Sequence, residues 1–349
     1  MSIDNKPPIL RLVIFFSVMG FLFRSASGQE NNDFYDNTVA RELPGPKQIE
    51  VIGEIANPGT VDLSTLPLRS QFVRETRLVD GENRFLGSYR YDGCSLFDIL
   101  KEKYVNKKNR DEFKSVIDLL VLVENRRGDR VILSWGEIFY PTQLHRIMIA
   151  TRVAPIIPTL TKEEWPLPEE TRLIASDDLA TVRNIAAPSR ITVFSAPLSF
   201  PRPAAAPGVL YSPALNIFDL SGKKVKALET LAGDLPVLDY PAVFYGRGKG
   251  FHGIENFSGR PLKEILKALF PASEQNLKRG YFTIAAIDGY RIAVSAAELF
   301  NRNDFAEFLI VDRGLDSAGG RFAIFPAPDF FSDRAVKAVS QIHFRLVGE

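Results

Sequence analysis

Apolar and polar residues alternate in several short stretches of this chain, and turn residues end the clearest of them. Residues 49–55 alternate and are followed by Asn57-Pro-Gly59, a pattern typical of a strand that ends at a turn. Residues 215–220 repeat the pattern before Ser221-Gly222. Further strands are predicted at 118–123, 130–134, 190–194, 282–287, 291–295 and 341–346. Strands therefore dominate the prediction.

Helical spacing of apolar residues occurs just after a glycine in two blocks, Tyr91–Leu100 and Phe257–Leu266. Both blocks read Gly-x-x-Leu-x-x-Ile-Leu, which predicts a short helix in each. A serine also precedes a glutamate by three positions at two places, the arrangement of a capping box before another short helix. These pairs are Ser134 with Glu137 and Ser295 with Glu298. The predicted fold class is α+β.

The two halves of the chain repeat one another in three blocks that follow in the same order. The glycine blocks form the first match, and Arg127–Phe139 matches Asp288–Phe300 as the second. In the third and weakest block, Leu173, Asp178, Arg183 and Ile191 match Ile324, Asp329, Arg334 and Ile342. Separations of about 160 residues indicate a tandem duplication, and each copy is long enough to bury its own core.

The N-terminus has the layout of a secretory signal peptide. Lys6 and Arg11 precede the apolar run 12–23, and small residues follow up to Gly28, where we expect cleavage. An uncleaved anchor is the alternative, although the run is short for a membrane span. The signal predicts an exported protein, periplasmic or extracellular, with no membrane span after cleavage.

The repeat, together with the composition of the segments outside its two copies, predicts the domain organisation of the chain. Residues 29–46 are polar and end in Pro44-Gly-Pro46, which predicts a flexible lead-in, and the stretch 195–213 is rich in proline and alanine, which predicts a semi-rigid linker. The predicted organisation is a signal peptide at 1–28, a lead-in at 29–46, a first copy at 47–194, a linker at 195–213 and a second copy at 214–349.

Composition narrows the possible partners. The chain has 349 residues, 45% of them hydrophobic and 24% charged, as in ordinary globular proteins. Loss of residues 1–28 removes three basic groups and one acid, so the formal net charge changes from +1 to −1. Such a near-neutral protein has no electrostatic footprint for nucleic acid. Cys94 is the single cysteine, so no internal disulfide can form.

The second copy contains the fullest set of motifs that are similar to a known family. They are Phe257-Ser-Gly-Arg-Pro-Leu262, Asp288-Gly-Tyr-Arg291, Gly319-Gly320 and the segment from Phe325-Pro326 to Val339. In this order they resemble the molybdopterin-binding domain of sulfite oxidase-like oxidoreductases, and the first copy matches more loosely. The resemblance implies two copies of that strand-rich domain and, if the activity is kept, oxidation or reduction of a small substrate through molybdopterin.

The resemblance also implies a cysteine that binds molybdenum, roughly a dozen residues before the glycine of the helix block. The corresponding slots fall near 78–81 and 247–250, and neither contains cysteine. Members of the family typically travel folded with a twin-arginine signal, and no Arg-Arg pair precedes the apolar run here. Both departures favour a protein without the cofactor.

Cys94 has two interpretations. It is a small buried thiol at a helix start, or it is a displaced metal or redox thiol whose pKa is lowered by the helix. The first interpretation is preferred, so no catalytic residue is expected and Cys94 is only a weak candidate.

The segment 246–253 is the one stretch that resembles an anion cradle, because its glycines free backbone N–H groups beside Arg247, Lys249 and His252. A solvated loop is the preferred interpretation, and a site for an anion or a pterin-like ligand is the alternative. The three histidines, His145, His252 and His343, lie far apart in sequence, so no metal site is predicted.

Three functions remain open. The preferred hypothesis is an exported, non-catalytic protein whose two domains act as a binding or interaction scaffold for an unknown protein partner, with no cofactor. The second is a molybdopterin-dependent oxidoreductase. The third is an exported protein that binds a small anionic ligand through the glycine-rich loop of the second copy.

Overall fold

The computed structural model describes residues 39–200, 212–315 and 319–348, which belong to one compact unit. The predicted signal peptide lies outside the described residues, as do most of the predicted lead-in and residues 201–211 of the predicted linker. Within the lead-in, Arg41–Glu42 forms a short strand, β1.

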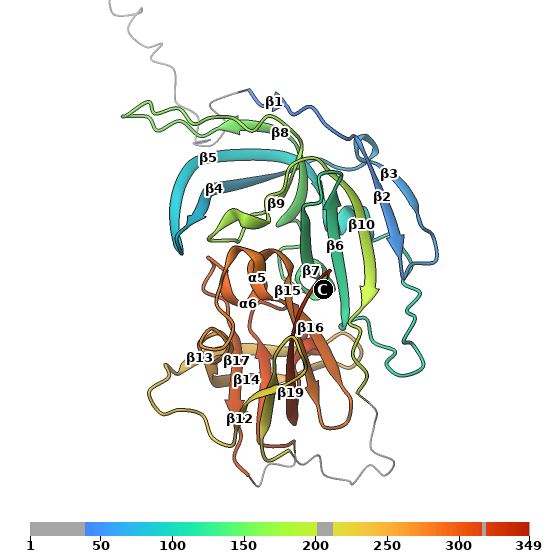
Figure 1. Ribbon diagram of the computed structural model, residues 1–349, viewed down its shortest axis with the longest axis vertical. Helices are drawn as coiled ribbons and strands as arrows, with labels where there is room; N and C mark the ends of the chain where they lie inside the picture. Colours follow the sequence, from blue (N-terminus) through green and yellow to red (C-terminus); the bar gives the residue numbers. More distant parts are fainter. Residues whose placement is uncertain (1–38, 201–211, 316–318, 349) are drawn as a thin grey trace, which may run out of the picture. The chain divides into compact units, whose positions relative to one another are not determined.

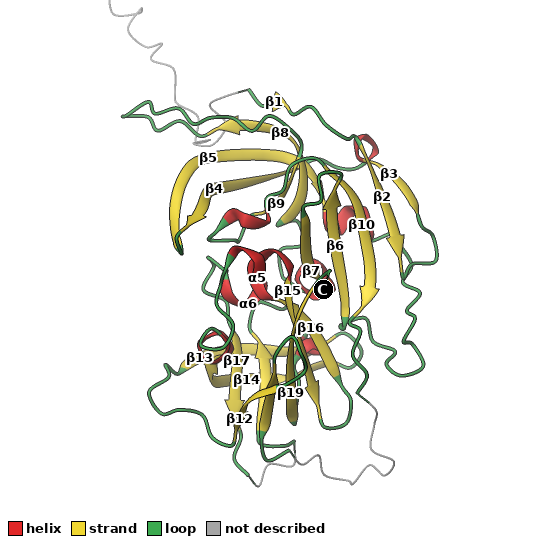
Figure 2. Cartoon of the chain, viewed as in Figure 1, coloured by secondary structure: helices red, strands yellow, loops and turns green. Residues whose placement is uncertain are grey.

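Strands make up most of the regular structure in both halves (Figure 2). Those of the first half are β1 (Arg41–Glu42), β2 (Gln48–Gly53), β3 (Gly59–Asp62), β4 (Arg69–Val79), β5 (Glu82–Ser95), β6 (Leu119–Asn125), β7 (Arg130–Ser134), β8 (Ile147–Pro155), β9 (Arg172–Ala175) and β10 (Pro188–Ser195). Those of the second half are β11 (Leu215–Phe218), β12 (Lys224–Leu228), β13 (Leu238–Gly246), β14 (Gly250–Pro261), β15 (Gly280–Ala286), β16 (Arg291–Ser295), β17 (Phe308–Asp312), β18 (Phe322–Pro326) and β19 (Val339–Leu346).

The helices are all short. The α-helices are α2 (Leu96–Leu100), α3 (Trp135–Phe139), α4 (Leu262–Leu266), α5 (Glu274–Arg279) and α6 (Ala296–Phe300), and the 3-10 turns are η1 (Leu63–Thr65), η2 (Thr181–Arg183) and η3 (Ser332–Arg334). The helix predicted in each glycine block is about one turn long, because the preceding strand, β5 or β14, continues almost to its first residue.

The expected α+β class is therefore wrong. Strands account for 47% of the described residues and helices for only 12%, and the strands form four small sheets that are arranged like the blades of a four-bladed β-propeller. The same finding corrects the expectation of sulfite-oxidase-like, molybdopterin-binding domains. The shared glycine, leucine and turn positions encode short hairpins and one-turn helices, which are not specific to one fold.

Each sheet draws its strands from one half of the chain (Figure 1). In the first half the orders are β1-β8-β5-β4, with β9 beside β8, and β3-β2-β10-β6-β7. In the second half they are β13-β14-β17-β18 and β12-β11-β19-β15-β16. In both halves a strand near the start of the half pairs in parallel with its last strand, β2 with β10 and β11 with β19. The two five-stranded orders beginning with β3 and β12 thus correspond strand by strand.

One hydrophobic cluster extends through both halves. It includes Ile49 and Leu96 from the first half and Ile217 and Leu262 from the second, all without exposed surface. Full burial of side chains of this size contributes about 1.5–3 kcal/mol each. A core shared in this way makes the packing of each half depend on the other.

Backbone hydrogen bonds join the two halves reciprocally. The Leu179 N–H donates to the Asn301 carbonyl at 2.8 Å, and the Phe330 N–H donates to the Tyr140 carbonyl at 2.7 Å. In the sequence repeat, Leu179 corresponds to Phe330 and Tyr140 to Asn301, so the second bond repeats the first with the halves exchanged. Two isolated β-bridges cross the junction in the same reciprocal way, Pro141 with Asp329 and Asp178 with Arg302.

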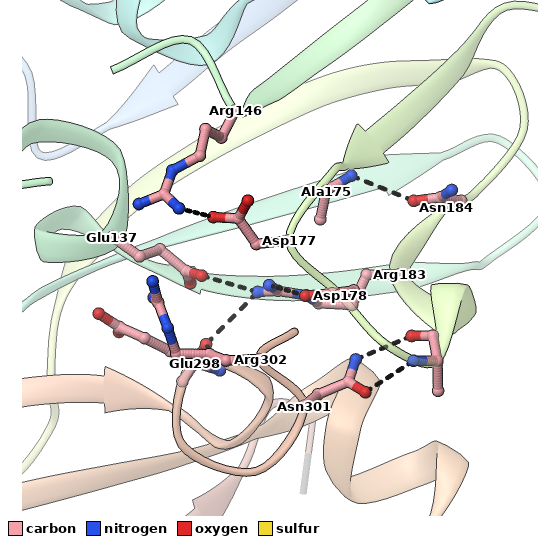
Figure 3. Close-up of polar contacts among 12 residues, drawn as sticks. Glu137, Arg146, Ala175, Asp177, Asp178, Arg183, Asn184, Glu298, Asn301 and Arg302 are labelled. Atoms are coloured by element: carbon pink, nitrogen blue, oxygen red, sulfur yellow. Dashed lines mark hydrogen bonds and ion pairs between the residues drawn. The ribbon is translucent and has the colours of Figure 1, made fainter. Parts of the chain in front are cut away.

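Buried charges lie beside these backbone contacts (Figure 3). Arg183 binds both carboxylate oxygens of Asp178 at 2.7 Å and the Glu137 carboxylate at 2.9 Å. Its guanidinium also lies 3.4 Å from the Ser295 hydroxyl of the other half. The Arg183 and Glu137 side chains are no more than 5% exposed, so neither is screened by solvent.

The second half repeats this arrangement around Arg334. Its guanidinium contacts Asp329 at 2.5 and 2.7 Å, lies 2.7 Å from the Glu298 carboxylate, and reaches the Ser134 hydroxyl of the first half at 3.4 Å. Ser134 in turn donates to Glu298 at 2.7 Å. Burial raises the pKa of Asp329 to about 6. The charges of the third sequence block thus meet at the junction.

The two predicted capping boxes differ because the glutamate of the second one is bonded at the junction. Ser134 and Glu137 form the complete box, with both reciprocal bonds present. Ser295 accepts the Glu298 N–H, but the Glu298 carboxylate contacts Arg334 of its own half and accepts a hydrogen bond from Ser134 across the junction. The predicted motif is therefore complete in the first half only.

Replacement of Arg183 by alanine should destabilise the protein strongly. The Asp178 and Glu137 carboxylates would stay buried without their partner, a change that costs about 3–5 kcal/mol. Arg190→Ala is the matched control, because Arg190 pairs with Glu50 on an exposed surface, where a pair contributes about 0–1 kcal/mol. Urea unfolding of both variants measures the difference, and equal losses of stability would show that the Arg183 cluster is not a structural centre.

Candidate interaction surface

Cys94 lies at the end of β5 and is completely buried. Its thiol donates to the Leu63 carbonyl at 3.1 Å. Burial, with a further contribution from Asp98, raises the pKa of this thiol to about 11. A buried thiol with a raised pKa and a backbone partner favours the interpretation of Cys94 as a packing residue.

Three polar residues beside Cys94 have the composition of a hydrolase triad but not its geometry. The Ser95 hydroxyl lies 3.0 Å from Nδ1 of His145, and Asp98 lies 3.6 Å from the same nitrogen. A catalytic triad needs the serine and the carboxylate at opposite ring nitrogens. Here Ser95 accepts the Asp98 N–H at 3.0 Å and caps α2. The cluster is a helix cap, and Asp98 is bound to Arg69 at 3.1 Å.

The residues present do not fit a molybdenum cofactor held through a thiolate. The first slot implied by the resemblance falls on the β4–β5 turn at 78–81, and the second on the β13–β14 turn at 247–250. Both turns lack cysteine, and the Cys94 thiol faces the Leu63 carbonyl in the core. We therefore derive no chemistry through that cofactor.

The glycine-rich segment forms the end of a long hairpin. Strands β13 and β14 pair from Leu238 with Gly259 to Gly246 with Gly250, and their turn contains Arg247 and Lys249. Arg247, Lys249 and His252 are all exposed. The Arg247 backbone N–H donates to Asp333 at 2.9 Å, which ties the turn to η3. Arg247, Lys249 and His252 thus lie at one end of the hairpin, on an open tip.

One face of this hairpin is apolar and exposed. Val243 pairs directly with Ile254, and Tyr245 pairs directly with Phe251. Directly opposed residues share a face of the sheet. Ile254 is 75% exposed, Phe251 62% and Val243 60%. The ring of Phe330, which is also exposed, lies 6.0 Å from that of Tyr245 and extends the surface.

The other face of the hairpin packs on the protein. Phe257 stacks on Phe325 with ring centres 3.9 Å apart, and Phe244 lies 5.4 Å from Phe257. These aromatic contacts hold the hairpin in place. We name the exposed residues Val243, Tyr245, Phe251, Ile254 and Phe330 the apolar face.

The hairpin also has an open edge that its counterpart in the first half lacks. There β5 pairs with β4 on one side and with β8 on the other, from Tyr89 to Ser95, and Ile156 N–H donates to the Ser88 carbonyl. In the second half β14 pairs with β17 only at Arg260 and Pro261. Within the described part of the chain, 250–259 pair with β13 alone.

The apolar face has no counterpart in the first half either. By the sequence repeat, Ile254 corresponds to Ser88. Ile254 pairs with Val243 in the second half, whereas Ser88 pairs with Arg74 in the first. In the first half the pair is polar and β8 covers the edge of β5. In the second half the pair is apolar and the edge of β14 is open. This difference identifies the β13–β14 hairpin as the candidate interaction surface.

The histidines are not brought together. His145 lies beside Ser95, His252 lies on the hairpin, and His343 stacks on Phe218 with ring centres 4.3 Å apart. No group of three or more His, Cys, Asp or Glu side chains in the described part of the chain could hold a metal ion. Among the residues that the structure describes, no helix has the length and apolar character that a bilayer crossing requires.

Comparison of the chain with protein-family models gives no match, and comparison with curated proteins gives none. No family membership follows from these comparisons. The functional argument therefore depends on this chain's own residues.

Sequence reasoning found the cations of the hairpin but not its apolar face. The predicted loop at 246–253 contains residues of two strands, Gly246 at the end of β13 and Gly250–Gly253 at the start of β14. A signal was present, because Val243, Tyr245 and Phe251 flank the glycines within a few positions. Without strand registration, however, a sequence does not show which side chains share a face.

The Cys94 thiol should resist alkylation in the native protein. Burial raises its pKa to about 11, so at pH 7.5 almost no thiolate is present and the sulfur is shielded. Iodoacetamide labelling followed by mass spectrometry should show modification only in urea concentrations that unfold the chain. Rapid labelling of the native protein would restore the redox interpretation of Cys94.

The His343 imidazole should make stability fall in mild acid. Burial and Arg345 lower its pKa to about 4, below the ordinary value of 6.5. The unfolded chain therefore binds more protons between these values, and the contribution of His343 is lost as the pH falls from about 6.5 towards 4. His343→Gln removes this titration, so wild type should lose more stability than the variant over that range. Parallel pH profiles from urea unfolding would contradict the assignment.

Proposed function

We propose that this chain is an exported, non-catalytic interaction scaffold, and that an extended segment of a partner protein binds along the open edge of β14. The observation behind the proposal is the uncovered β14 edge beside the apolar face. An isolated two-stranded hairpin is marginally stable in water, and exposed strand edges are normally protected. Addition of a partner strand would complete the sheet and cover the face.

The first half supplies the pattern for this complex. Strand β8 pairs with β5 from Tyr89 onward, and its Ala154 and Pro155 extend that pairing away from α2. The equivalent positions of β14, Ile254–Ser258, have an open edge among the described residues, and Gly259 already lies against β17. The partner segment would take the place that β8 occupies in the first half.

Charge and apolar surface define the chemistry of the partner. Arg247, Lys249 and His252 lie at the turn end, and the exposed acid on β14 near them is Glu255. We therefore expect acidic residues at the end of the segment that lies beside the turn. Apolar residues at alternate positions would lie beside Ile254 and extend the apolar face.

The reactive groups favour a binding role over catalysis. The Cys94 thiol is buried and protonated, and Ser95 is used as a helix cap. The buried carboxylates of the junction are paired with Arg183 and Arg334. Each of these groups already has a structural partner.

Site-specific photo-crosslinking tests the proposal in cells that make the full chain. A photoreactive residue at Ile254 should cross-link a discrete partner protein, and one at Leu160, which is 94% exposed in the first half, should not. The double variant Arg247→Glu, Lys249→Glu should reduce the product about fivefold, because each exposed ion pair contributes about 0.5 kcal/mol.

Unfolding midpoints of the variants serve as the folding control, since all the changed side chains are exposed. A product that contains two copies of this chain would identify self-association and overturn the proposed partner. Equal cross-linking from positions 254 and 160, or no response to charge reversal, would remove the β14 edge as the binding site.

A further inference from the structure

A second surface feature lies in the first half, away from the β13–β14 hairpin in the chain. A cavity of about 620 Å³ is bounded by the start of β2, the end of β3, the β6–β7 turn and the start of β10. Its lining includes Lys47, Ser64, Arg126 and Ser189. The volume falls within the range of about 300–1,000 Å³ that small-ligand sites occupy.

One cation at this cavity is unpaired. Arg127 is held by Glu170 through two contacts of 2.6 Å, so its charge is already balanced. Arg126, next to it in the turn, forms no hydrogen bond or ion pair within the described residues. Asp62 lines the same cavity as Lys47, and its carboxylate accepts the Ser64 N–H and hydroxyl. The cavity therefore has positive charge available for an anion.

An adjoining cavity of about 200 Å³ shares Lys47 and Ser64 with the first and has an apolar wall. Leu63, Leu66 and Leu68 line it, and Leu68 is half exposed. The Thr171 side chain also lines this cavity, and its buried hydroxyl has no hydrogen-bond partner among the described residues. A ligand oxygen that reached Thr171 would supply that partner.

We propose that the two cavities together bind a small amphiphilic carboxylate. Because Lys47 lines both cavities, a carboxylate beside Lys47 can approach Arg126 on one side. Its apolar body then lies against the leucine wall, where burial from water is favourable. Charge-assisted hydrogen bonds from the two cations fix the orientation of the ligand.

The corresponding turn of the second half lacks the cations. By the sequence repeat, Arg126 corresponds to Ile287 and Arg127 to Asp288. The Asp288 carboxylate accepts the Tyr290 N–H at 3.0 Å, so the turn keeps its form without a positive charge. Retention of the turn does not require Arg126, which supports a role in binding and predicts one site per chain.

Equilibrium dialysis of the purified chain with octanoate tests the proposal, with acetate and 1-octanol as partial ligands. Octanoate should bind once per chain, and each partial ligand at least about tenfold more weakly, because each lacks one of the two interactions. Arg126→Ala should weaken octanoate binding about fivefold and leave 1-octanol binding unchanged. Arg110→Ala, at another exposed arginine, should leave both unchanged.

Leu68→Asp tests the apolar wall separately and should weaken octanoate binding by at least about tenfold, with an unfolding midpoint close to wild type. The site is excluded if Arg126→Ala binds octanoate as tightly as Arg110→Ala, or if 1-octanol binds as well as octanoate. Neither result bears on the β14 edge, because these variants leave the hairpin unchanged.

Discussion

Pairing of two buried arginines with carboxylates at the junction of the halves is the constraint on which the structure depends. Arg183 and Arg334 each bind an aspartate of their own half and approach a serine of the other. A buried guanidinium is tolerated only when its charge and its donors are matched. Each guanidinium keeps its carboxylate partners within its own half, so separation of the halves would expose both clusters to water and break the hydrogen bond from Ser134 to Glu298. The shared hydrophobic cluster adds to this dependence.

A reciprocal junction leaves the outer sheets free to differ. The junction elements correspond one to one between the halves, whereas β8 spans Ile147–Pro155 and β17 only Phe308–Asp312. Shortening of that strand uncovers β14, and the residues at the uncovered place are apolar instead of polar. The cationic turn between β6 and β7 is a feature of the first half only, since its counterpart in the second half lacks both arginines. Each half thus has one surface that the other lacks.

Local sequence patterns predicted the strands well, because alternation and glycine turns act over a few residues. The stretch expected at 49–55 is β2, and those at 130–134 and 291–295 are β7 and β16. The fold class was wrong because an apolar i, i+3, i+4 pattern is satisfied by a single turn, and only packing decides whether a helix continues. The apolar face depends on the pairing of Val243 with Ile254 in a register shifted by a bulge, which no local pattern reveals.

The buried reactive groups of the molecule differ from some of its exposed side chains in whether they have a structural partner. Groups with catalytic potential are buried and matched: the Cys94 thiol by the Leu63 carbonyl, Ser95 by the first turn of α2, and the junction carboxylates by arginine. Arg126 and the apolar face, in contrast, lie at the surface without a matched partner among the described residues. Folding gains little from an exposed Ile254 or from an unpaired, exposed Arg126. The proposed binding would account for both, since a partner strand or an anion would bury or neutralise what the fold leaves open.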